Sequence, residues 1–79
     1  MSKAISLIEE ARKLSERFEH GHMIRFKDGC LLAIFRNQVV LWGSSGQVMA
    51  WVDVDKNECA VELLTRVDFL DYLEQGLEE

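Results

Sequence analysis

The pattern of apolar and polar positions along the chain centres on an almost continuous apolar stretch over residues 30–54. This stretch is long enough for three β-strands, because strands in globular proteins usually run for about 3–10 residues. Most of it is too apolar for either side of those strands to face water, which is typical of strands buried on both sides. We therefore expect a sheet that the segments before and after it cover.

Residues 3–20 precede this stretch and show the spacing of an amphipathic helix. Its expected inner face consists of Ala4, Ile8, Ala11, Ser15 and Phe18, flanked by Ile5, Leu7 and Leu14. Ser2 suits the N-cap position, because its hydroxyl accepts a hydrogen bond from an orphan backbone N–H. Gly21 suits the end of the helix, where a residue in the left-handed conformation is common.

Residues 22–27 alternate between polar and apolar side chains, as a half-buried strand does. The Asp28-Gly29 pair that follows is a strong signal for a two-residue type I′ hairpin turn, because both residues of that turn need positive φ. Such a turn fixes the register of the hairpin, with Lys27 opposite Cys30, Phe26 opposite Leu31 and Ile24 opposite Ala33.

Three further turns are expected, around Asn37, over residues 43–46 and over residues 55–57, all of which are rich in Gly, Ser, Asn or Asp. A fifth strand follows over residues 59–64. One long helix over residues 58–75 is the alternative interpretation of this last segment.

Residues 65–68 match a capping box, in which Thr65 caps a helix and Asp68 reaches back to the cap. This second helix would begin at Arg66 and end near Gly76. The predicted fold is therefore α+β: an N-terminal helix, a five-stranded antiparallel meander and a short C-terminal helix. The meander forms either an open sheet or a partly closed barrel, and residues 1–79 form a single domain.

Tight hairpins at every turn assign each strand residue to one of two faces, and both faces are apolar. The aliphatic face, which we expect to pack against the helices, comprises Cys30, Leu32, Ile34, Val39, Leu41, Val48, Ala50, Val52, Val54, Cys59, Val61 and Leu63. The aromatic face comprises Ile24, Phe26, Leu31, Ala33, Phe35, Val40, Trp42, Met49 and Trp51. Either one helix covers each face, the sheet closes into a barrel, or the aromatic face meets another subunit.

We predict the third of these arrangements, a homodimer, because aromatic residues and Met are enriched at protein interfaces. The predicted interface residues are Phe26, Phe35, Trp42, Met49 and Trp51.

Charge is distributed unevenly within the net charge of −5. Residues 53–79 hold nine acidic and two basic side chains, whereas residues 1–52 hold five acidic and seven basic ones. The predicted acidic surface consists of Asp68, Asp71, Glu74, Glu78 and Glu79. It would repel phosphate backbones and attract a basic protein partner, although a solvated helix face is the more ordinary explanation of such a run.

Nucleic acid is excluded by a second observation, the placement of Arg25, Lys27 and Arg36 opposite the aromatic face. Single-stranded nucleic acids need aromatic and basic side chains on the same face. A membrane span is not expected, because no apolar run approaches about 18 residues. The N-terminal residues lack the apolar core of a signal peptide, so we expect a cytoplasmic protein.

Two motifs resemble ion sites without meeting their requirements. His20 and His22 lack further ligands for a metal, and a histidine at a helix end commonly stabilises the helix dipole. The D-x-D-x-N sequence that starts at Asp53 resembles a calcium loop, but Glu58 stands where Gly is required and Leu64 where Glu is required. A hairpin turn rich in Asp and Asn explains that sequence.

The remaining candidates also have ordinary structural explanations. Cys30 and Cys59 lack C-x-x-C spacing and are expected to be reduced core thiols. The glycines and serines of residues 43–46 lack the Lys and helix of a phosphate loop. We therefore predict no catalytic residue, no cofactor and no metal site.

The sequence supports a small acidic, non-enzymatic interaction module of the adaptor, regulator or inhibitor type, self-associating through the aromatic face. The alternative is a small-ligand binding module that uses the aromatic and Met side chains as an apolar pocket.

Overall fold

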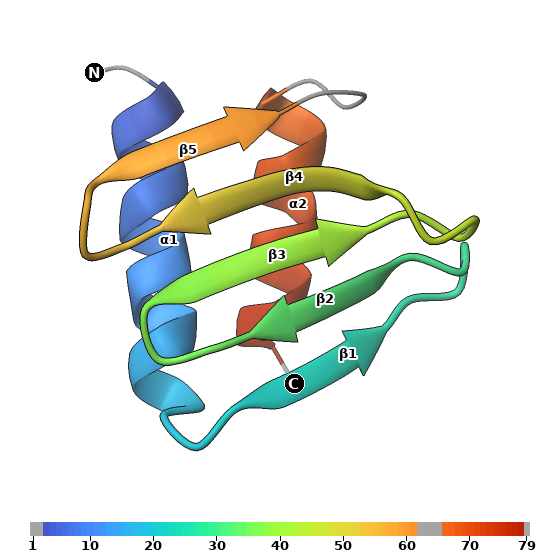
Figure 1. The fold of residues 1–79 in the computed structure, drawn as a ribbon, viewed down its shortest axis with the longest axis horizontal. Helices are drawn as coiled ribbons and strands as arrows, with labels where there is room; N and C mark the ends of the chain where they lie inside the picture. The colour runs from blue at the N-terminus through green and yellow to red at the C-terminus, as the bar shows by residue number, and fades with distance from the viewer. Residues whose placement is uncertain (1–2, 62–65, 79) are drawn as a thin grey trace.

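A computed structural model describes residues 3–61 and 66–78 of the chain. It has the predicted α+β fold, with an N-terminal helix, five antiparallel strands in one open sheet and a C-terminal helix (Figure 1). The elements are α1 (Lys3–Arg17), β1 (His22–Arg25), β2 (Leu31–Ile34), β3 (Gln38–Trp42), β4 (Val48–Asp53), β5 (Glu58–Val61) and α2 (Arg66–Leu77). Thr65 of the predicted capping box lies outside the described residues.

The strands follow one another across the sheet in chain order, so β1 and β5 form its two edges. The sheet is therefore open, and the partly closed barrel is wrong. The single long helix over residues 58–75 is also wrong, because Glu58–Val61 pairs with β4 as a strand. α1 ends at Arg17, earlier than predicted, and Gly21 follows with the expected positive φ of 90°.

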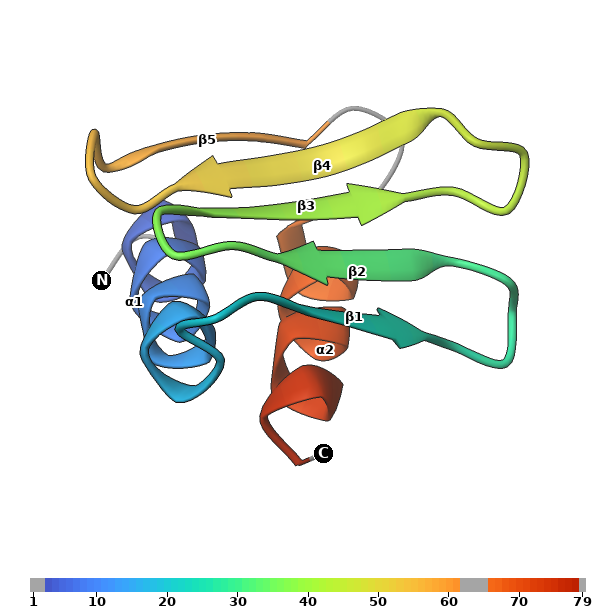
Figure 2. The same cartoon turned by 60° about the horizontal axis from the view of Figure 1, so that its bottom comes forward.

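Both helices lie side by side on the same face of the sheet (Figures 1 and 2). The largest fully buried side chains are Phe69, Leu7, Leu14, Leu32, Ile34, Leu41, Leu73, Val39 and Val52. They come from both helices and from one side of the strands, so the core lies between the helices and the sheet. We call this side of the sheet the helix-covered face. The arrangement with one helix on each face is wrong.

The close approach of α2 to the sheet and to α1 depends on Gly76, which is buried. A side-chain carbon at this position would lie 3.1 Å from Leu32, 3.2 Å from Leu14 and 3.4 Å from Ile24. Glycine inside a helix costs about 1 kcal/mol relative to alanine, so this contact explains its presence. The predicted end of the helix near Gly76 is confirmed, since α2 ends at Leu77.

The first hairpin differs from the predicted two-residue turn by one residue. The Phe26 N–H donates to the Cys30 carbonyl at 2.9 Å, and the Gly29 N–H donates to the Phe26 carbonyl at 3.0 Å. Residues 26–29 thus form a four-residue turn in which only Gly29 has positive φ, at 94°. Ile24 consequently pairs with Leu32 and not with Ala33.

A slip of one residue turns every side chain of a strand to the opposite face. Ile24 and Phe26 therefore belong to the helix-covered face, where Ile24 is buried and Phe26 packs against the core. Met23 and Arg25 are exposed on the other side. The predicted register would have placed Arg25 against the helices, and burying an unpaired charge is costly. That cost favours the observed register.

The hairpin formed by β3 and β4 contains a β-bulge that was not predicted from the sequence. Trp42 pairs with Val48, but the neighbouring Leu41 pairs with Ala50, which leaves Met49 as the extra residue on β4. Met49 packs against the core. Val48 lies beside Trp42, in the place that was predicted for Met49. The assignment of Met49 to the aromatic face is therefore wrong, because a bulge inverts the alternation beyond it.

Candidate functional site

The side of the sheet away from the helices is its most unusual surface, and we call it the open face. Figure 2 shows that neither helix covers it. The strand pairing places on it Met23, Arg25, Leu31, Ala33, Val40, Trp42, Val48, Trp51 and Ala60. Phe35 extends the same alternation just beyond the end of β2.

Large apolar side chains on the open face are accessible to solvent. Met23 is 62% exposed and Phe35 is 45% exposed, whereas Ala33 and Val40 lie buried beneath their larger neighbours. Five strands spaced about 4.8 Å apart and about 17 Å long give the sheet a footprint of about 400 Å². The exposed apolar patch occupies part of this footprint, and the largest apolar patch on a monomer is often functional.

Part of the open face is hollowed to a volume of about 400 Å³. Trp42, Trp51, Val40 and Val48 form its apolar floor and walls. Gln38, Asp53, Lys56 and Glu58 lie along its polar border. The arrangement offers indole surfaces next to carboxylates, which suits an apolar side chain or a cation with an apolar stem.

The structure retains three of the five predicted interface residues on this face, namely Phe35, Trp42 and Trp51. Phe26 and Met49 turn to the helix-covered face for the reasons given above. Met23 and Val48 lie on this face instead, and neither was predicted there. Arg25 also shares the face with the aromatic side chains, so the predicted separation of basic from aromatic residues is wrong at this position.

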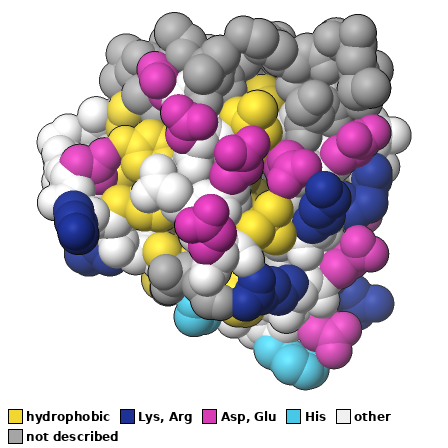
Figure 3. Space-filling model, turned by 180° about the vertical axis from the view of Figure 1, so that it is seen from behind, with side chains coloured by type: hydrophobic (Ala, Val, Ile, Leu, Met, Phe, Trp, Pro, Cys, Tyr) yellow, Lys and Arg dark blue, Asp and Glu magenta, His cyan; other side chains and the backbone are white. Residues whose placement is uncertain are grey.

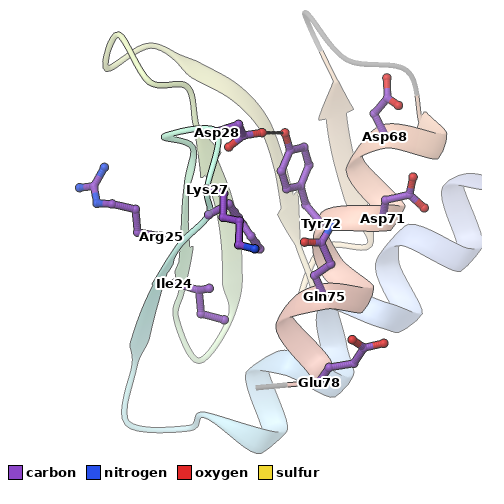
Figure 4. A pocket seen from close by; sticks show the side chains of 10 residues that line it. Ile24, Arg25, Lys27, Asp28, Asp68, Asp71, Tyr72, Gln75 and Glu78 are labelled. Atoms are coloured by element: carbon purple, nitrogen blue, oxygen red, sulfur yellow. Dashed lines mark hydrogen bonds between the residues drawn. The ribbon is translucent and has the colours of Figure 1, made fainter.

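A second concave site lies between the first hairpin and α2 and has a volume of about 780 Å³ (Figure 4). Its centre is Tyr72, whose hydroxyl donates a hydrogen bond to the Asp28 carboxylate. The same hydroxyl lies 3.8 Å from the Cys30 sulfur, and the Tyr72 ring packs 4.9 Å from that of Phe26. These contacts tie the hairpin to the helix.

The hydrogen bond between these two side chains shifts both of their pKa values. The Tyr72 donor, together with the Cys30 backbone N–H at 2.9 Å, holds the pKa of Asp28 below its ordinary value. The Asp28 acceptor and, to a smaller extent, burial raise the pKa of Tyr72 well above its usual 10. Tyr72 therefore stays protonated at neutral pH as a hydrogen-bond donor. The pair has a structural role, because it links the first hairpin to α2.

The other sequence candidates remain apart from one another. Cys30 is buried and Cys59 is half-buried, and the two are not bonded to each other. The His22 ring stacks on Phe18 at 4.4 Å, while His20 is exposed beside Glu19. The Asp53 carboxylate accepts the N–H groups of Asp55 and Lys56, as the predicted turn requires. Among the described residues, no three His, Cys, Asp or Glu side chains are grouped closely enough to hold a metal ion.

Of the predicted acidic residues, Asp68, Asp71 and Glu74 lie on α2 and Glu78 directly follows it, on the opposite side of the molecule from the open face. Asp68, Asp71, Glu74 and Glu78 are exposed there, and Glu79 lies outside the described residues. Figure 3 shows acidic side chains spread across the helix side of the molecule with basic ones among them. Asp68, Asp71 and Glu78 also border the site around Tyr72.

The described helices include none with the length and apolar character needed to cross a membrane. No family model, curated protein or solved structure matches the chain. The open face and the Tyr72 site are therefore the features from which function is inferred.

Proposed function

We propose that the protein is a small, non-enzymatic interaction module that associates with a second copy of itself through the open face. The observation that carries this proposal is the position of both helices on one side of the sheet, which leaves Met23, Phe35, Trp42 and Trp51 accessible on the other. Burial of apolar side chains between two copies is the main driving force that the described residues offer.

The size of the face indicates a weak dimer. Two footprints of about 400 Å² bury about 800 Å² in total, below the 1,200–2,000 Å² that is usual for stable complexes. We therefore expect association to depend on protein concentration. High salt should weaken it little, because most of the contact is apolar.

Charge placed among the apolar side chains of the open face tests the proposal. Trp51→Glu and Met23→Glu should each shift the sedimentation equilibrium to monomer, because a carboxylate would be buried without a partner. Gln75→Glu adds the same charge to the exposed side of α2 and should leave association unchanged. The proposal is wrong if the variants at positions 23 and 51 fold and associate as strongly as the native chain.

The hollow beside Trp42 and Trp51 favours a second function, the binding of a small ligand. Its volume of about 400 Å³ lies within the range of small-molecule sites, which is about 300–1,000 Å³. Both tryptophans of the chain border this hollow, so their fluorescence would report on occupancy. A saturable emission change with one compound from a metabolite panel, at a concentration where the protein is monomeric, would support this function.

The acidic side chains of α2 would remain accessible in a dimer formed through the open face. A basic protein partner for Asp71, Glu74 and Glu78 is therefore compatible with self-association. Affinity capture by the native chain but not by a variant with all three changed to Gln or Asn would support such a partner. Recovery of the same proteins by both chains would count against it.

A further inference from the structure

The charges on the open face lie at opposite corners. Arg25 is on the edge strand β1, in the row that it shares with Leu31 and Trp42. Asp53 and Glu58 pair with each other across β4 and β5, in the row that ends the face on the other side. Four strand spacings and four residues along the strands separate Arg25 from Glu58, a diagonal of about 23 Å.

The side chains at these corners point away from the helices. Arg25 follows the buried Ile24, and Figure 4 shows its guanidinium directed away from α2. The guanidinium donates a long hydrogen bond, of 3.4 Å, to the Gly29 carbonyl. At the opposite corner Lys56 borders the same hollow as Asp53 and Glu58, which leaves these three residues with one excess negative charge.

We propose that two copies stack face to face with their strands crossed, so that the Arg25 of each copy meets Asp53 and Glu58 of the other. This inference rests on the proposed self-association and specifies its geometry. The two-fold axis lies between the two sheets and runs perpendicular to the line from Arg25 to Glu58. Rotation about it places the Arg25 corner of each copy over the Glu58 corner of the other. The same contact then forms twice, as a closed two-fold dimer requires.

The same rotation also brings apolar residues together. When the residues are placed by the strand pairing and the usual spacings between strands and residues, Trp42 of one copy lies over Trp51 of the second copy. Phe35 lies close to the axis and meets its own counterpart, and the large Leu31 falls over the small Ala60. The strands of the two sheets cross at about 70°, nearer to orthogonal than to aligned sheet packing.

In this dimer the Arg25 guanidinium lies between indole rings and carboxylates and makes two favourable contacts. The carboxylates of Asp53 and Glu58 offer charge-assisted hydrogen bonds, and the Trp51 ring offers a cation–π contact. Opposite charges at the corners fix the register of the dimer, while the apolar centre supplies most of the affinity.

A charge exchange tests the geometry. Arg25→Glu and Glu58→Arg each place like charges at both contacts of a homodimer, so each variant alone should associate at least about tenfold more weakly than the native chain. Mixing the two variants restores an opposite pair at both contacts, and a heterodimer should form with about native affinity. Native mass spectrometry identifies it, since the two chains differ in mass.

Two matched variants serve as controls. Lys27→Glu and Asp55→Arg make the same charge changes at exposed positions close to the two corners but off the open face, and both should associate as the native chain does. Asp53 is left unchanged because its carboxylate holds the turn between β4 and β5.

The outcomes separate this inference from the proposed function. A native chain that dimerises while both corner variants dimerise equally well overturns the crossed geometry and leaves self-association standing. Weak association of each variant without recovery in the mixture also overturns the geometry. A native chain that is monomeric throughout overturns the proposed function and this inference together.

Discussion

At the scale of single residues, the hydrogen bond from Tyr72 to Asp28 is the contact with the clearest electrostatic consequences. It links the first hairpin to α2 across 44 residues of sequence. The pKa of the acceptor is lowered and that of the donor is raised, mainly by this one bond. Nothing in the sequence pattern indicates the pairing, because it depends on the register of β1 and on the position of α2.

Spectroscopic titration tests the shift of Tyr72, which is the only tyrosine of the chain. We expect no tyrosinate absorbance at 295 nm near pH 10 while the protein is folded, because the raised pKa keeps the hydroxyl protonated. Asp28→Asn removes the charge next to the hydroxyl and should move the transition back towards pH 10. A native chain that titrates at pH 10 while circular dichroism shows it folded would contradict the pair.

The stability that Asp28 contributes should depend on pH. Its pKa is lower in the folded chain than in the unfolded chain, so the contribution is present above about pH 4 and is lost as the pH falls through the folded value. Tyr72→Phe should lower the unfolding free energy by about 0.5–1 kcal/mol at pH 7, a modest amount because solvent screens the exposed carboxylate.

Urea denaturation at several pH values measures this contribution. The difference between the native chain and the Tyr72→Phe variant should shrink as the pH falls from about 4 through the lowered pKa of Asp28. A difference that stays constant over this range would show that Tyr72 acts through packing alone.

At the scale of elements, the order and type of the helices and strands follow from the sequence, but two of the registers do not. The apolar spacing of α1 and the alternation of β5 predict their positions within a few residues. The Asp28-Gly29 pair predicts a turn without specifying whether two or three residues lie between the paired strand ends. A further signal was available in β1, since the predicted register directs Arg25 and Lys27 towards the helices.

The bulge at Met49 is harder to foresee. It follows the second four-residue turn, and its effect is to bury the Met side chain in the core and to place Val48 beside Trp42. Since each register error moves a whole set of side chains between faces, the two errors account for the misplaced Phe26 and Met49. The side of the sheet on which α2 packs depends on the tertiary structure and is not encoded in local periodicity.

The geometry of the first turn can be tested at its glycine. Gly29→Ala forces an alanine to a φ of 94° and places its Cβ 2.9 Å from the Cβ of Ser44. Gly46→Ala is the matched control, since φ is 90° and the added Cβ meets nothing within 4 Å. We expect denaturation to show a loss of about 1–2 kcal/mol for the control and a larger loss at position 29. Equal losses would contradict the contact between the two turns.

The register of β1 can be tested with two phenylalanines that the predicted register placed on the same face. Phe26→Ala should lower the unfolding free energy by about 2–4 kcal/mol, because Phe26 packs against the core and Tyr72. Phe35→Ala should lower it by less than about 1 kcal/mol, because Phe35 is 45% exposed. Similar losses for the two variants would favour the predicted register over the observed one.

At the scale of the whole molecule, the fold is two-layered, with the helices on one side and the open face on the other. A chain of 79 residues has few means of covering both faces of a five-stranded sheet, and here both helices serve the same core. The described part of the chain therefore provides one well-packed side and one apolar side without a cover. This asymmetry is the basis of the proposed self-association.

The most direct test of self-association is the solution mass of the native chain, measured by light scattering or sedimentation from micromolar to about 1 mM at low and high salt. We predict a mass that rises with concentration from 9.1 kDa towards twice that value and persists at high salt. The emission of both tryptophans should shift to the blue over the same concentrations. A mass of 9.1 kDa throughout would contradict the proposed dimer.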